Sequence, residues 1–275
     1  MVKLGLIAGG GALPVSLARH CRAVGRPSFV VRLKGFADRA LLEFDGADVG
    51  IAELGKGIKV LRQSGCGAVC LAGKVDRPDM AAMKPDLRGL SILPGAILAA
   101  RGGDDALLSF LLREFEREGF LVEGAHDVMA GLTLPHGHLG RHEADPVDLS
   151  DISRALEAAR VIGRLDIGQG AVCCRGLVLA LEAQEGTDAM LDRVAELPQT
   201  LRGNAIARCG VLAKASKPGQ ELRIDLPTIG PETVRRAATA GLAGIAGEAG
   251  FLLVLEREET VRLADETGLF ILGVG

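Results

Sequence analysis

Residues 4–14, LGLIAGGGALP, combine a continuous apolar run, a glycine triplet and a proline. The run from Leu4 to Ala8 predicts a buried strand, and the triplet from Gly9 to Gly11 predicts a tight turn. Pro14 stands where proline is favoured, in the first turn of a helix. The chain therefore opens as a strand, a glycine loop and a helix, which together form the first unit of an α/β sheet.

The remainder of the first half repeats this alternation. We expect strands at 28–33, 47–52 and 67–72, and a helix that starts at Asp104 and carries an apolar stripe. Strands that alternate with helices favour a mostly parallel sheet with helices on both faces. The sequence therefore predicts a Rossmann-like, nucleotide-binding type of domain over residues 1–130.

A break in the pattern follows this domain. The stretch 131–149 contains two prolines and three glycines and has no periodicity, so we interpret it as a linker. A second α/β domain, expected to be catalytic, is predicted over residues 150–275. Its expected elements are a β-rich run at 171–181 broken at Gly176 into a hairpin or bulge, a strand at 251–256, and a helix at 257–267 that ends at Gly268.

Composition narrows the class of protein. Of the 275 residues, 48% are hydrophobic and 24% are charged, which is typical of a folded globular chain. A net charge of −3 without a block of Lys and Arg argues against nucleic acid as a partner. The six cysteines have no CxxC spacing, so we interpret them as reduced thiols in a cytoplasmic protein. Because no apolar stretch reaches the ~20 residues of a membrane span, any lipid must be met from the membrane surface.

The densest candidate site is residues 211–230, VLAKASKPGQELRIDLPTIG. Its cations Lys214, Lys217 and Arg223 can neutralise phosphoryl oxygens. The carboxylate of Asp225 can hold Mg²⁺ or orient a water molecule. A solvated loop between two strands explains the same residues, so this segment alone leaves both interpretations open.

Two glycine-containing loops of the first domain are further candidates. Gly10 and Gly11 let backbone amides approach a phosphate, although a tight turn also explains them. Gly73 and Lys74 follow the strand at 67–72 and place a cation at the sheet edge where open α/β folds bind ligands. The third glycine and the ribose-binding acid of a dinucleotide fingerprint are missing, which argues against NAD.

A last candidate surrounds the β-rich run of the second domain. Gln169 precedes this run, and Thr187 and Asp188 stand at the start of the next helix. A helix N-terminus favours anions, and a carboxylate offers a hard oxygen ligand. A plain helix cap explains both residues equally well. The occurrence of this turn in the same domain as the Lys-rich loop favours a site for phosphate and a metal ion.

Several of these segments, taken in order, resemble the LpxI family. They are LGLIAGGGALP, AGKVDRP, EGAHDVM, LDIGQGAV, EAQEGTDAML, KPGQELRIDLPTIG and AGLAGIAGEAG. The similarity extends from the first strand to the final GLFILG. It implies a two-domain cytoplasmic enzyme of lipid A synthesis that hydrolyses UDP-2,3-diacylglucosamine to UMP and 2,3-diacylglucosamine 1-phosphate. It also implies a divalent cation, Mg²⁺ or another such as Mn²⁺.

Roles for individual residues follow from the resemblance and the candidate sites together. The family's essential aspartate in its D-x-P-T-I-G motif falls on Asp225, which we expect to be catalytic and, with Asp188, to ligate the metal. The residues expected to bind substrate are Gly10, Gly11, Gly73, Lys74, Gln169, Thr187, Asp188, Lys214, Lys217 and Thr228.

The expected partners are the lipid-linked UDP-sugar, the surface of the inner membrane as a peripheral contact, and a second copy of the chain in a homodimer. Two other functions stay open at this point. A non-catalytic sugar-nucleotide sensor would keep the binding loops without turnover, and a dinucleotide-dependent oxidoreductase would need the ribose acid that is missing.

Overall fold

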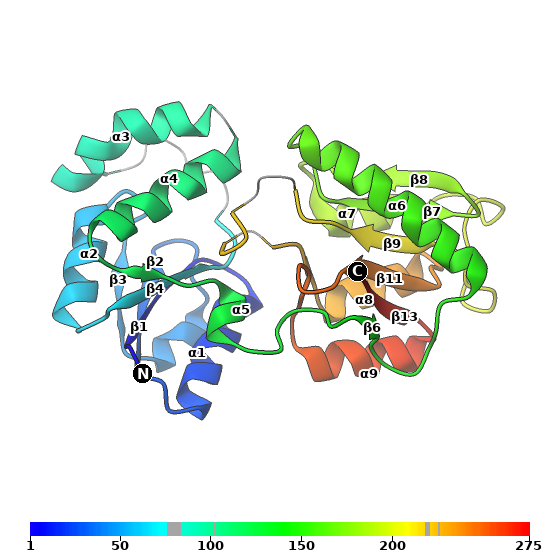
Figure 1. Ribbon diagram of the computed structural model, residues 1–275, viewed down its shortest axis with the longest axis horizontal. Coiled ribbons are helices and arrows are strands. Elements are labelled where there is room, and N and C mark those ends of the chain that lie inside the picture. The colour runs from blue at the N-terminus through cyan, green and yellow to red at the C-terminus, as the bar shows by residue number, and fades with distance from the viewer. Residues whose placement is uncertain (76–83, 102, 218–220, 225) are drawn as a thin grey trace. The chain divides into compact units, whose positions relative to one another are not determined.

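In the part of the chain that the structure describes, two large sheets, one in each half, organise the molecule (Figure 1). The computed structural model describes residues 1–75, 84–101, 103–217, 221–224 and 226–275, with 104 and 105 described by their backbone alone. The contacts divide the chain into two compact units. Unit 1 comprises Met1–Ala130 and Glu221–Asp225, and unit 2 comprises Gly131–Gln220 and Leu226–Gly275.

Unit 1 contains a parallel sheet with the strand order β3-β2-β1-β4-β5. Its strands are β1 (Leu4–Ala8), β2 (Ser28–Leu33), β3 (Gly46–Val49), β4 (Ala68–Ala72) and β5 (Leu121–Val122). Its helices are α1 (Ala12–Ala23), α2 (Leu54–Gln63), α3 (Leu87–Ala100), α4 (Asp104–Arg117) and α5 (Ala125–Val128), with a 3-10 helix at Arg39–Glu43. The order reverses between β1 and β4, and this is the switch point at which open α/β sheets bind ligands.

The core of unit 1 explains why these segments are strands and helices. Ile7, Val31 and Val69 project from one face of the sheet and pack against Ile58 of α2 and Leu112 of α4. Helix α1 lies against β1 and β2, and Figure 1 shows α1 and α5 on the opposite side of the sheet from α2 and α4. The predicted α/β class, with a mostly parallel sheet between helices, is confirmed.

Unit 2 contains a mixed sheet with the order β6-β13-β11-β9-β7-β8. Its strands are β6 (Gly137–His138), β7 (Gly170–Cys174), β8 (Leu177–Leu181), β9 (Val211–Lys214), β11 (Gly244–Glu248) and β13 (Phe270–Val274), and β10 (Thr228–Ile229) pairs separately with β12 (Leu253–Val254). Its helices are α6 (Pro146–Arg164), α7 (Gly186–Ala195), α8 (Pro231–Thr239) and α9 (Arg257–Thr267). The central strands β9, β11 and β13 run parallel, so their carboxyl ends meet at one edge.

Alternation along β7 fills both layers of the unit 2 core. Cys173 packs with Leu156 of α6 on one face. Its neighbour Val172 packs with Leu191 of α7 on the other. Successive residues of a strand point to opposite faces, so one strand can bury apolar side chains under two layers of helix.

Two local turn signals of unit 2 are confirmed. The break at Gly176 is a hairpin turn between β7 and β8, with Arg175 at φ 51° and Gly176 at φ 76°, and a register shift lies at Val172/Cys173. Two consecutive residues with positive φ are typical of a type I′ turn. The predicted helix at 257–267 is α9, and Gly268 ends it at φ 75°.

Two expectations for unit 2 are wrong. The stretch 131–149 is no linker, because Leu134 is buried in the core, β6 pairs with β13, and α6 begins at Pro146. The expected strand at 251–256 is reduced to the two residues of β12. The longer strand of this region is β11, which lies just before it in a glycine-rich stretch. Glycine is needed there because a Cβ on Gly244 would lie 2.3 Å from the Phe270 ring.

Candidate substrate site

Four of the predicted residues meet at the switch point of unit 1. There the loops after β1 and β4 pair, because the Gly10 amide donates to the Lys74 carbonyl at 2.8 Å and the Lys74 amide donates to the Gly10 carbonyl at 2.9 Å. A Cβ on Gly73, which has φ 94°, would lie 2.7 Å from the Gly10 carbonyl oxygen. These glycines therefore bring Gly10, Gly11, Gly73 and Lys74 together where such sheets bind ligands.

Two of the three backbone amides in the glycine triplet form hydrogen bonds within the sheet and the loop pairing. The Gly9 amide donates to the Ala72 carbonyl at 2.9 Å, and the Gly10 amide is used by Lys74. Gly11 is exposed, caps the N-terminus of α1 at φ 91°, and has open space around the position of a Cβ. The part of the triplet suited to a phosphate is therefore Gly11, where the helix N-terminus offers its amides.

A buried polar cluster forms at the carboxyl end of β9 in unit 2. The Nζ of Lys214 donates to Thr187 Oγ1 at 2.7 Å and to the Thr228 carbonyl at 3.3 Å. Thr187 Oγ1 in turn donates to Glu182 Oε1 at 2.7 Å, and this oxygen lies 3.9 Å from Lys214 Nζ. We call these four residues the Lys214 cluster. The structure thus joins three predicted residues around Glu182, which the sequence reasoning missed.

Burial makes the two charges of the Lys214 cluster depend on each other. Lys214 is 4% exposed and Glu182 is 6% exposed. Among the described residues, no donor reaches Glu182 Oε2, and the buried side-chain oxygen of Gln169 also lacks one. A buried carboxylate with one oxygen that lacks a donor is costly, and Lys214 offsets that cost for Glu182. Part of the lysine charge is therefore offset before any phosphate arrives.

A second polar group lies at the same sheet edge. Glu248 ends β11 and accepts from Ser216 Oγ at 2.9 Å and from Arg160 Nη2 at 2.6 Å. Burial raises the pKa of Glu248, but the hydrogen bonds from Arg160 and Ser216 outweigh burial and hold that pKa below its usual value. Glu248 and Ser216 were not predicted. The signal that could have found them is the parallel pairing of β9 with β11, which places their carboxyl ends side by side.

Two predicted residues of unit 2 pair with side chains outside the Lys214 cluster. Lys217 Nζ donates to Asp166 Oδ1 at 2.7 Å. Asp188 is exposed in the first turn of α7, and its Oδ2 lies 3.8 Å from Arg236 Nε. The carboxylate of Asp188 at the start of α7 therefore already has a cationic neighbour in Arg236.

The segment that carries the family aspartate belongs to unit 1. Arg223 Nη1 donates to Glu116 Oε1 of α4 at 2.7 Å, and Ile224 packs against the unit 1 core. Hydrogen bonds from Arg223 to Glu221 and Glu116 raise the pKa of the guanidinium above its usual value. Arg223, expected to neutralise phosphoryl oxygens, is therefore held by two carboxylates. Asp225 itself lies outside the described residues.

The described residues do not assemble a metal site by themselves. Within the ranges that the structure describes, no three His, Cys, Asp or Glu side chains gather closely enough to hold an ion. The proposed ligand Asp188 faces the cation of Arg236, which opposes binding of a second cation. The described residues alone therefore give no support for a metal site, and the expected ligand Asp225 is not among them.

Comparison with known proteins covers nearly the whole chain. The model of the LpxI N-terminal domain matches residues 3–132, and that of the LpxI C-terminal domain matches residues 135–272. The UDP-2,3-diacylglucosamine pyrophosphatase LpxI of Caulobacter vibrioides is 64% identical over 274 residues, which cover 100% of this chain and 98% of the relative.

Proposed function

The chain belongs to the LpxI family, and on that premise we propose that it hydrolyses the pyrophosphate bond of UDP-2,3-diacylglucosamine in lipid A synthesis. The products are UMP and 2,3-diacylglucosamine 1-phosphate. The observation that carries the proposal is the 64% identity, over the full chain, to a relative named for a pyrophosphatase of this substrate.

The chemistry required is modest and agrees with the residues present. Cleavage of a pyrophosphate needs neutralised phosphoryl oxygens and a water molecule held in line, with little covalent work for the protein. In the proposed mechanism, Asp225 orients this water and accepts its proton. Lys74 and Lys214 offset phosphate charge, and the helix N-terminus at Gly11 receives a phosphate oxygen.

The Lys214 cluster has a positioning task in this scheme. Thr187 and the Thr228 carbonyl fix the ammonium group at 2.7 and 3.3 Å. A lysine held in this way loses little further freedom when a phosphate binds. The roles of Gln169 and Lys217 in substrate binding are also part of the proposal, with Lys217 held beside Asp166.

Dependence on a divalent cation, Mg²⁺ or Mn²⁺, is proposed with Asp225 and Asp188 as ligands. When bound, such an ion would supply positive charge to the phosphoryl oxygens through hard oxygen ligands. Protein stripped with EDTA should release no UMP until Mg²⁺ is restored. Full activity in EDTA would refute the dependence on a divalent cation. Full activity of Asp188→Asn would show that Asp188 is not a metal ligand.

Release of UMP is the test of the proposed function. Purified protein incubated with UDP-2,3-diacylglucosamine in detergent micelles should yield UMP and the lipid phosphate in equal amounts. If the substrate binds but neither product forms across a range of metal ions, the chain is a sugar-nucleotide sensor and the hydrolase proposal fails.

We further propose a cytoplasmic homodimer that meets the inner membrane peripherally. Support for the dimer comes from the edge strand β8, whose Leu177, Val178 and Leu181 are exposed, because an apolar edge strand is a template for pairing. Light scattering should give twice the chain mass of 28.6 kDa. A monomer at micromolar concentration would contradict the dimer.

A further inference from the structure

Helix α3 carries four large apolar side chains that are exposed. Leu87, Leu90, Ile97 and Leu98 are 89%, 56%, 42% and 69% exposed. The exposed Pro94 lies between them. Spacings of three, four and seven residues put these side chains on one face of a helix. We call the five residues the α3 apolar face.

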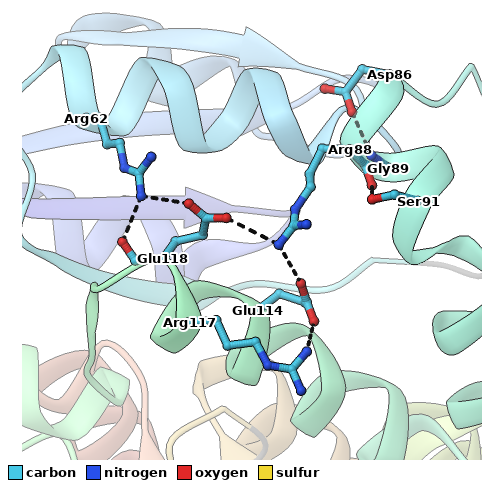
Figure 2. A network of polar contacts seen from close by, with 8 residues as sticks. All are labelled: Arg62, Asp86, Arg88, Gly89, Ser91, Glu114, Arg117 and Glu118. Carbon is cyan, nitrogen blue, oxygen red and sulfur yellow. Dashed lines mark hydrogen bonds and ion pairs between the residues drawn. The ribbon is translucent and has the colours of Figure 1, made fainter.

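Polar contacts, by contrast, hold the inner side of α3. Figure 2 shows Arg88 between Glu114, which lies in α4, and Glu118, which follows the last residue of α4. Arg88 Nη2 donates to Glu114 Oε2 at 3.0 Å and to Glu118 Oε1 at 3.2 Å. Asp86 caps the helix by accepting from the Gly89 amide at 2.7 Å. These contacts hold the helix to unit 1 without Leu87, Leu90 and Leu98, which are exposed.

Small residues allow this inner side to pack closely. A Cβ on Gly89 would lie 2.0 Å from the Ala52 carbonyl oxygen, and a Cβ on Gly95 would lie 2.9 Å from the Phe110 ring. In an ordinary surface helix the apolar stripe faces the core and the polar residues face water. Helix α3 instead has large apolar side chains on its exposed face as well, and clustered exposed apolar side chains mark an interaction surface.

Charge at the ends of the helix indicates what covers this surface. Lys84 and Arg101 are exposed on either side of α3, and the single acid between them, Asp86, is used as the cap. An apolar helix face flanked by basic residues is suited to the interface of an anionic bilayer. None of the helices in the described residues is long and apolar enough to cross a membrane, so α3 would lie in the plane of the surface.

We propose that the α3 apolar face inserts into the surface of an anionic lipid bilayer, with Lys84 and Arg101 against lipid phosphates. The inference rests on the proposed function for its purpose, because a substrate with two acyl chains resides in such a surface. Contact through α3 would let the enzyme take that substrate directly from the bilayer.

Vesicle flotation of the full chain tests this assignment. Wild-type protein should float with vesicles of phosphatidylglycerol and phosphatidylethanolamine, and much less with pure phosphatidylcholine. The double variant Leu90→Gln/Leu98→Gln should lose at least about tenfold in partitioning. The matched control Leu42→Gln/Leu165→Gln removes leucines that are 64% and 67% exposed elsewhere and should partition like wild type.

The outcomes separate this inference from the proposed function. The α3 assignment is overturned if wild-type protein does not float with anionic vesicles, or if the α3 variant floats as well as wild type. A variant that changes the sedimenting mass but not flotation would show that a second copy covers the face, which also overturns it. UMP release is measured in detergent micelles, where no bilayer is needed. Flotation without UMP release would support the α3 assignment and refute the proposed hydrolase function. UMP release without flotation would overturn the α3 assignment alone.

Discussion

Removal of the buried cation at position 214 should cost both activity and stability, for separable reasons. In Lys214→Met the side chain keeps its length but loses its charge. Glu182 then stays buried, 6% exposed, with Thr187 as its hydrogen-bond donor among the described residues and Oε2 still without one. Under the role proposed for Lys214, activity should fall because a cation that would offset phosphate charge is lost.

The expected stability loss can be worked from the geometry. At the 3.9 Å that separates Lys214 Nζ from Glu182 Oε1, and with an effective dielectric constant of about 20, the attraction is about 4 kcal/mol. Loss of one partner of a buried ion pair costs roughly 3–5 kcal/mol in proteins. We therefore expect the free energy of unfolding of unit 2 to fall by about 3 kcal/mol. With a urea m-value of about 2 kcal/mol/M, the midpoint should fall by about 1.5 M.

The double variant Glu182→Gln/Lys214→Met separates the two effects. The glutamine side chain at position 182 is neutral, so the cost of the uncompensated carboxylate disappears and most of the stability should return, whereas hydrolysis should stay low. Urea unfolding followed by circular dichroism, with the two units fitted as separate transitions, gives the stability. If the double variant is as unstable as Lys214→Met, the charge coupling is wrong, and if it regains activity, Lys214 does not act on phosphate.

Two further predictions concern unit 1. Burial raises the pKa of the Cys70 thiol to about 12 from its ordinary 9.0, so this thiol keeps its proton longer in the folded state and its contribution to stability is lost as pH rises from 9 to 12. Denaturation across this range should show a loss that is shallower in Cys70→Ala by about 1.4 kcal/mol per pH unit, and identical slopes would refute the assignment. Gly73→Ala should lower the free energy of unfolding by roughly 3 kcal/mol, because its Cβ would meet the Gly10 carbonyl at 2.7 Å. The control Gly25→Ala, at φ 70° in open space, should cost only about 1 kcal/mol, and equal losses would contradict a role for close loop approach.

Local signals in the sequence were sufficient for much of the fold. The apolar run at Leu4, the break at Gly176 and the stop at Gly268 each act within a few residues, so pattern and turn chemistry predict them. Strand β11 was missed because its glycines respond to distant neighbours, as Gly244 does to Phe270. The burial of Leu134 likewise depends on its packing in the unit 2 core, which composition does not reveal.

The candidate site divides in the same way. Lys214 and Thr187 could be found as polar residues at element ends, but their contact requires the sheet register that brings β9 beside the start of α7. Glu182 ends an apolar run and carries no motif, so it emerges only from the fold. The exposed apolar side chains of α3 are a further case, because an apolar sequence predicts burial and the contacts of Arg88 with Glu114 and Glu118 are a tertiary feature.

The decisive experiment for the hydrolase proposal compares wild type with Asp225→Ala on UDP-2,3-diacylglucosamine in detergent with Mg²⁺, by measuring UMP release and substrate binding on the same samples. Wild type should release UMP rapidly, whereas the variant should release none that is detectable while its fold and substrate binding are retained. UMP release by Asp225→Ala at the wild-type rate, or none by either protein, would contradict the proposed mechanism.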